Sequence, residues 1–188
     1  MKPNPGGDLR PQSSWLIGFH WATLALILIG VAAVLGREWI DDKLLRLCLI
    51  QLHRGSGLLV MMLTLVRLPL SPWLKDRVVE TTQLMRYAAS ATHWLLYGLL
   101  LAIPAVGWAL SSAHGQDLSF LGLIPLPPLV ARDRDLADQL QQIHEALAIA
   151  MLCIALIHAS AALWHHYVRR DAVLMSMLPR RRGSIENP

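Results

Sequence analysis

The chain has 188 residues, of which 54% are hydrophobic and 16% are charged, and its mean hydropathy is +0.42. Ordinary soluble domains carry about a quarter charged residues, so this composition excludes such a domain and excludes a disordered protein. The net charge is +4, which the apolar stretches described below connect with membrane topology rather than with nucleic acid. Cys48 and Cys153 form no CxxC or CxxCH pattern, so neither a disulfide framework nor a zinc knuckle is indicated.

Four stretches are long and apolar enough to cross a bilayer, whose hydrocarbon core of about 30 Å takes roughly 20 helical residues. They are expected at residues 15–35, 47–66, 91–110 and 144–167. The first is too long for the apolar region of a cleavable signal peptide. The sequence therefore predicts an all-α fold, an integral membrane four-helix bundle. It forms a single domain over residues 1–188, with polar tails at 1–12 and 180–188.

The connections between these stretches differ in composition. Residues 37–46 are few and mixed in charge, and residues 67–90 are basic, with Pro69 and Pro72 expected to end the second helix. The longest connection, 111–142, contains three prolines and the acidic run 132–138.

The distribution of charge predicts the orientation. An even number of spans places both termini on one side, together with the second connection. That side holds 11 of the 17 Lys and Arg residues: Lys2, Arg10, Arg67, Lys75, Arg77, Arg86, Arg169, Arg170, Arg180, Arg181 and Arg182. By the positive-inside rule, both termini face the cytoplasm.

Every apolar stretch contains a histidine, and an ionisable residue inside a span indicates a functional site. These histidines are His20, His53, His93 and His158, with His144 at the start of the fourth stretch. Depth sorts them into an outer layer of His53 and His144 and an inner layer of His20, His158 and, as a third member, His93. Since 14 residues separate His144 from His158, these two lie on one helix face, about 21 Å apart.

Opposed histidines from two helices are the ligands of a b-type haem. Two histidines occupy both open coordination positions of the iron, which suits electron transfer. Two layers therefore predict two haem b groups in series across the membrane. Metal or proton transport and unrelated structural histidines are the alternatives, although zinc or copper usually needs three or four clustered ligands.

Small and basic residues accompany the histidines. Gly55 and Gly57 leave room for a porphyrin or for close helix packing. Arg54 and Arg67 are candidate partners for the propionates of the outer and inner haem, or for lipid headgroups.

The order of several short motifs resembles the bacterial cytochrome b561 family. The motifs are PheHisTrp (19–21), LeuHisArgGlySerGly (52–57), ValArgLeu (66–68), AlaIleProAlaValGlyTrp (102–108), IleHisGluAlaLeuAla (143–148), LeuIleHisAlaSerAlaAlaLeuTrpHisHisTyr (156–167) and MetLeuPro (177–179). The resemblance implies a di-haem cytochrome of the bacterial inner membrane. It pairs His20 with His158 and His53 with His144 as axial ligands, which selects His20 over His93. It also implies electron transfer from superoxide outside to ubiquinone inside, a superoxide:ubiquinone oxidoreductase-like activity.

The remaining histidines include two candidates for a quinone site, since imidazole donates hydrogen bonds and relays protons near neutral pH. His165 is the first candidate and His93 the second, with binding to headgroups as the alternative. No role is assigned to His114 or His166, and no residue is predicted to be catalytic. The expected partners are quinone, a small outer-side donor and membrane lipid, without nucleic acid. The alternative functions are an anchor subunit for a partner redox enzyme and a haem-free transporter.

Overall fold

The computed structural model describes residues 14–70, 83–120, 122–170 and 174–178. Within them, four long helices account for most of the chain: α1 (Ser14–Gly36), α2 (Lys43–Leu70), α3 (Gln83–Ala113) and α4 (Arg134–Trp164). All four, taken with the short helical turns that continue α1 and α4, are long and apolar enough to cross a membrane. The predicted fold class, an all-α membrane bundle, is confirmed.

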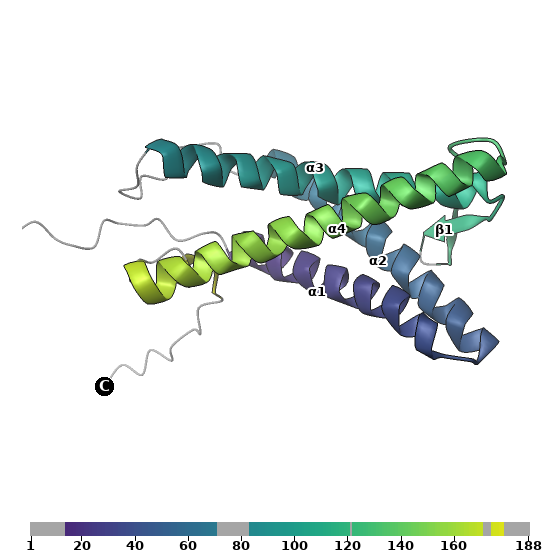
Figure 1. The fold of residues 1–188 in the computed structure, drawn as a ribbon, viewed down its shortest axis with the longest axis horizontal. Coiled ribbons are helices and arrows are strands. Elements are labelled where there is room, and N and C mark those ends of the chain that lie inside the picture. The colour runs from purple at the N-terminus through teal and green to yellow at the C-terminus, as the bar shows by residue number, and fades with distance from the viewer. Residues whose placement is uncertain (1–13, 71–82, 121, 171–173, 179–188) are drawn as a thin grey trace, which may run out of the picture.

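The short elements lie at the two ends of the bundle. The turn η1 (Arg37–Trp39) and the strands β1 (Leu118–Phe120) and β2 (Ile124–Leu126) lie at the right of Figure 1, which we name the hairpin end. The π-helical turn η3 (His165–Arg169) extends α4 at the opposite end, which we name the tail end, and η4 (Met175–Met177) follows it in the chain.

The long helices pack as two pairs joined in the middle. Helix α1 packs on α2 and α3 packs on α4, while α2 also packs on α3. In the described residues, α1 and α4 scarcely contact each other. Only 6% of the most apolar stretch of α4 is buried. Much of this helix is therefore free to face lipid or a bound group.

All four helices begin before their predicted spans, and the largest difference is in α4, which begins at Arg134 rather than at residue 144. Most of the acidic run 132–138, which follows the prolines of the long connection, is therefore helical. Asp133 caps the helix, since its side chain accepts a hydrogen bond from the Leu136 N–H at 3.1 Å, and Asp135 lies in the first turn. Carboxylates are favourable there because the N-terminal N–H groups are unpaired.

Glycine ends α3 at Gly115, whose φ is +69°. The N–H groups of Gly115 and Gln116 donate to the carbonyls of Ser112 and Ser111 at 2.8 and 3.0 Å. This pair of bonds is the Schellman motif, which favours glycine at the left-handed position.

The hairpin was not predicted. Strands β1 and β2 are antiparallel, with Leu118 opposite Leu126 and Phe120 opposite Ile124. The α3–α4 connection, which contains the hairpin, folds back onto α3, and Trp108 Nε1 of α3 donates to the Pro127 carbonyl at 3.0 Å. Both predicted tails, 1–12 and 180–188, and residues 71–82 between α2 and α3 lie outside the described residues.

Candidate functional site

The hairpin half of the bundle brings together the two histidines of the predicted outer layer. The ring centres of His53 on α2 and His144 on α4 are 6.0 Å apart, and the rings are inclined at 78°. Both side chains are half-buried and line a cavity to which all four helices contribute apolar residues, among them Val31, Leu99 and Met151.

Backbone carbonyls hold both rings. His53 Nδ1 donates to the Gly30 carbonyl at 2.9 Å, and His144 Nδ1 donates to the Ile103 carbonyl at 3.1 Å. Because a carbonyl oxygen only accepts, Nδ1 carries the proton and Nε2 keeps a free lone pair. Histidines that bind metals are commonly held in this way, with the other ring nitrogen as the ligand.

The separation of the rings suits one metal between them. Imidazole nitrogen binds a metal at about 2 Å, so two rings on opposite sides of one ion have centres on the order of 6 Å apart. The residues at the hairpin end therefore fit an iron with two histidine ligands.

Two glycines that were not singled out from the sequence make room for side chains at this site, Gly30 for Ser56 beside His53 and Gly107 for the His144 ring. A Cβ at Gly30 would lie 2.6 Å from Ser56 Oγ, and a Cβ at Gly107 would lie 3.1 Å from His144 Cε1. By contrast, a Cβ at Gly55 or Gly57 would meet nothing within 4 Å. A glycine inside an otherwise continuous apolar helix is the sequence signal that could have identified Gly30 and Gly107.

The tail half of the bundle brings together a second cluster, formed by His20, His93, His158 and Arg67. The rings of His93 and His158 have centres 5.3 Å apart. His20 lies close enough to His158, His93 and Arg67 for their charges to interact. Each helix thus contributes one residue, and the cluster holds one imidazole more than a single iron needs. Among the described residues, no three or more His, Cys, Asp or Glu side chains are grouped to hold a metal ion directly.

Arg67 gives the tail-end cluster its charge. Its Nε is buried and has no hydrogen-bond partner among the described residues, while its guanidinium lies over the ring of Tyr97, 5.6 Å from the centre. A buried donor without an acceptor is costly, so this site favours a ligand that brings an acidic group. Tyr97 was missed in the sequence, although its position four residues after His93 places both on one helix face.

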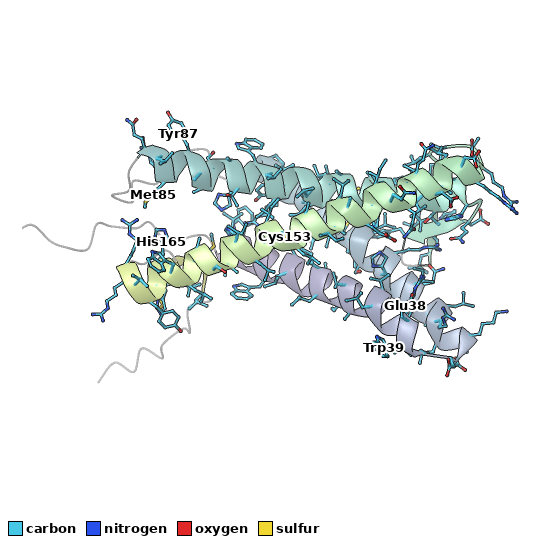
Figure 2. All side chains as sticks on the ribbon, in the orientation of Figure 1. Glu38, Trp39, Met85, Tyr87, Cys153 and His165 are labelled. Carbon is cyan, nitrogen blue, oxygen red and sulfur yellow. The ribbon has the colours of Figure 1, made fainter. Side chains whose placement is uncertain are left out.

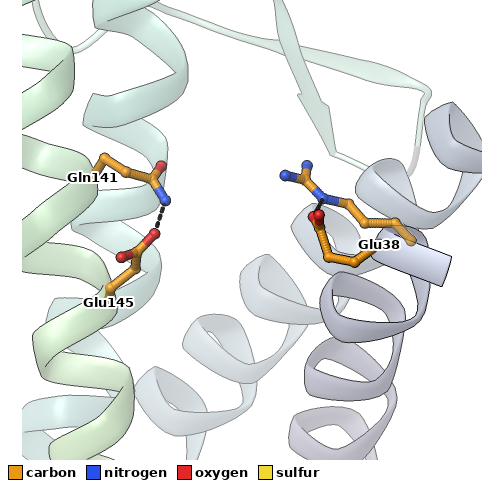
Figure 3. A network of polar contacts seen from close by, with 4 residues as sticks. Glu38, Gln141 and Glu145 are labelled. Carbon is orange, nitrogen blue, oxygen red and sulfur yellow. Dashed lines mark hydrogen bonds and ion pairs between the residues drawn. The ribbon is translucent and has the colours of Figure 1, made fainter.

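Arg54 lies at the rim of the hairpin end rather than in its cavity. Its Nη2 donates to Gln116 Oε1, and its charge interacts with that of Arg37. Arg37 itself pairs with Glu38 at 3.0 Å. Figure 3 shows this ion pair on the right and the hydrogen bond between Gln141 and Glu145 of α4 on the left.

The other candidate histidines lie at different depths. His93 is level with His158 because their rings are in contact, whereas His165 follows His158 by seven residues, about 10 Å along a helix. Figure 2 shows His165 and Met85 near the tail end. The Met85 sulfur accepts a hydrogen bond from Arg169 at 3.0 Å. The two quinone candidates are thus not neighbours at one level. His114 is exposed at the hairpin end, and the His166 ring contacts Tyr167.

Known proteins resemble this chain over almost its whole length. The sequence model described as "Prokaryotic cytochrome b561" matches residues 12–180. A protein of Yersinia pestis named "Probable superoxide oxidase CybB" is 32% identical over 175 residues, which cover 93% of this chain and 99% of that protein. "Cytochrome b561 homolog 1" of Escherichia coli (strain K12) is 33% identical over 169 residues, covering 88% and 96%.

The matched residues include all four long helices and both histidine clusters. The chain is a multi-pass membrane protein for electron transfer, and it belongs to the prokaryotic cytochrome b561 family.

Proposed function

We propose that this protein is a transmembrane di-haem cytochrome that carries electrons between an outer-side donor and the ubiquinone pool. The observation that carries the proposal is the His53–His144 pair, with ring centres 6.0 Å apart and both Nδ1 atoms held by carbonyls. Haem b would supply the one-electron chemistry.

Each proposed haem would have two histidine ligands. His53 and His144 would hold the haem at the hairpin end, and His20 and His158 would hold the haem at the tail end. The second pair is supported by the family pattern and by the proximity of His20 to His158. An iron held by two histidines would suit electron transfer rather than oxygen binding.

The remaining site residues bind and orient. The buried, unpaired Nε of Arg67 supports binding of a propionate at the tail end. Arg54 is assigned to a propionate at the hairpin end, where it would exchange its bond to Gln116 for a carboxylate. The apolar walls of the cavity at the hairpin end would exclude water from a bound haem. The two levels, about 21 Å apart along α4, form a path across the membrane.

We assign the hairpin end to the outside and the tail end to the cytoplasm of an inner-membrane protein, because the cations concentrate at the tail end. Quinone then reacts at the tail end, where His165 is the first candidate donor to a quinone oxygen and His93 the second. A quinone at the tail end would also have access to the cytoplasmic protons that its reduction consumes.

Superoxide is the proposed outer donor, on the basis of the name of the Yersinia pestis relative. The hairpin end carries more acidic than basic residues in its connections, so its overall charge does not attract an anion. Arg37 and Arg54, which lie close together beside the cavity, would have to attract the superoxide anion locally.

The test of this function is haem stoichiometry in single variants. The purified protein should contain two acid-extractable haem b groups per chain. His53→Ala or His144→Ala should remove one, and His20→Ala or His158→Ala should remove the other, as seen in the reduced absorption spectrum. His114→Ala is the matched control and should keep both. A His144→Ala variant with two haems would refute the ligand assignment.

A second experiment tests the electron donor and acceptor. Pulse-generated superoxide should reduce the haems at a rate that falls as ionic strength rises, because screening weakens the attraction. Slow reduction that is independent of salt would assign the donor role to quinol or to a partner redox subunit. His165→Ala should slow exchange with quinol while both haem bands remain.

A further inference from the structure

We infer that Trp21, together with residues 174–178, forms a clamp that positions His20 for the haem at the tail end. The inference rests on the proposed function, since it assigns a role to residues beside a proposed haem ligand. It gives a role to Trp21 of the PheHisTrp motif and to the start of the MetLeuPro motif, neither of which the proposed electron path uses.

The clamp is closed by a contact between opposite ends of the chain. Trp21 Nε1 donates to the Met177 carbonyl at 2.9 Å. This carbonyl belongs to the short turn η4, in which the Met177 N–H donates to the Leu174 carbonyl at 3.0 Å. The segment therefore docks on α1 through its main chain.

Trp21 connects this contact to the ligand histidine. The Trp21 indole lies edge-on to the His20 ring, with ring centres 5.8 Å apart and planes inclined at 81°. A fixed indole consequently limits the rotation of the imidazole beside it.

The packing of the helices explains why such a clamp is needed. His20 is on α1 and His158 is on α4, and these two helices scarcely contact each other in the described residues. At the tail end of α4, Arg169 donates to Met85 of α3, and Arg170 adopts a left-handed conformation with φ +54°. The C-terminal segment then ties the α3–α4 pair to α1 through Trp21.

The chain provides a matched contact at the other end of the bundle. Trp108 Nε1 donates to the Pro127 carbonyl at 3.0 Å, which holds the hairpin connection on α3. Both bonds join an indole to a main-chain carbonyl, but only Trp21 adjoins the tail-end cluster. Trp108→Phe is therefore the control for Trp21→Phe.

The experiment measures the rate of haem loss from proteins in which a second substitution has removed one of the two proposed haems. In a His144→Ala background, which retains the tail-end haem, Trp21→Phe should speed transfer of haem to an acceptor apoprotein about fivefold, the effect of one hydrogen bond. The electron paramagnetic resonance signal of that haem should broaden. In a His20→Ala background, which retains the hairpin-end haem, Trp21→Phe should change neither readout.

Two controls separate the clamp from general destabilisation. Trp108→Phe should leave the loss of tail-end haem unchanged, and Met177→Leu should also leave it unchanged because the contact uses the main chain. Equal acceleration by Trp21→Phe and Trp108→Phe, or no acceleration by Trp21→Phe, would overturn the inference.

A haem-independent readout separates failure of the clamp from failure of the proposed function. Trypsin should cleave after Arg169 or Arg170 faster in Trp21→Phe than in the parent, even in haem-depleted protein. A parent protein that never binds haem would refute the proposed function. Unchanged cleavage would refute the clamp whatever the haem content.

Discussion

The imidazoles at the hairpin end are oriented by residues of other helices. His53 on α2 bonds to Gly30 of α1, and His144 on α4 bonds to Ile103 of α3. Each ligand is thus held within its own helix pair, while the proposed iron would join the two pairs. Gly30 and Gly107 lie beside these contacts, and an added Cβ would come within 2.6 Å of Ser56 Oγ at Gly30 and within 3.1 Å of His144 Cε1 at Gly107.

The first prediction at this scale concerns Gly30 and Gly107. Gly30→Ala and Gly107→Ala should weaken haem binding at the hairpin end about tenfold or more, since overpacking costs about 1–3 kcal/mol. Gly98→Ala, where a Cβ meets nothing within 4 Å, is the control and should keep full occupancy. Haem titration of each variant measures the effect. Full occupancy in both contact variants would contradict the assigned role of these glycines.

The second prediction concerns the charge of Arg67. A cation beside a haem stabilises its reduced form, so Arg67→Leu should lower the midpoint potential of the tail-end haem. The expected shift is on the order of 50 mV, close to a tenfold change in a one-electron equilibrium. Redox titration monitored by absorption gives this value. The exposed Arg86 supplies the control, and an equal shift in Arg86→Leu would show that Arg67 has no specific effect.

At the scale of elements, local signals fix where α3 ends and α4 begins. Gly115 closes α3 and Asp133 caps α4, and the Asp133 N–H also donates to the Ala113 carbonyl at 3.0 Å. The two helix ends are therefore joined directly across the long connection. This junction sets the position of His144, which lies three turns into α4.

The prediction for this junction compares two glycines with positive φ. At Gly115 an added Cβ would also lie 2.9 Å from Arg132 Cδ, whereas at Gly122 (φ +73°) it meets nothing within 4 Å. Gly122→Ala should cost only the left-handed conformation, about 1 kcal/mol. Gly115→Ala should cost more, because Arg132 must also move. Thermal unfolding in detergent should give a lower midpoint temperature for Gly115→Ala than for Gly122→Ala. Equal midpoint temperatures would show that the contact with Arg132 adds no cost.

At the scale of the whole molecule, the bundle consists of two helix pairs with sites between them. The pairs α1–α2 and α3–α4 meet mainly through α2 and α3, as Figure 1 shows in the divergence of α1 from α3. Each proposed haem takes one ligand from each pair. Haem binding should therefore stabilise the association of the pairs, and loss of both haems should lower the unfolding temperature more than loss of one.

The prediction at this scale is the membrane orientation. Both native cysteines are exposed, so the test starts from a Cys48→Ser, Cys153→Ser background. Leu123→Cys, at a position 81% exposed in the hairpin, should react with an impermeant thiol reagent in intact spheroplasts. Tyr87→Cys, 71% exposed near the tail end, should react only after lysis. The reverse pattern would exchange the proposed outer and cytoplasmic ends.

The sequence by itself determined the four helices, the membrane class and the family. Long apolar runs can bury their backbone in lipid only as helices, so each run fixes its own conformation without reference to the others. The periodic spacing of His144 and His158 likewise fixed their common face. Composition did not show that the acidic run is mostly helical, because a helix cap and a polar loop have similar compositions and the Asp133 side-chain bond distinguishes them.

The tertiary structure decided which side chains meet. The approach of His93 to His158, the contact of Gly107 with His144 and the bond from Trp21 to Met177 join residues 37 to 156 positions apart. Such contacts depend on how helices rotate and cross, and a uniformly apolar surface in lipid does not specify this rotation. Packing, carbonyl acceptors and close approach at glycine fix it instead, which is why the sequence identified the histidines but not what holds them.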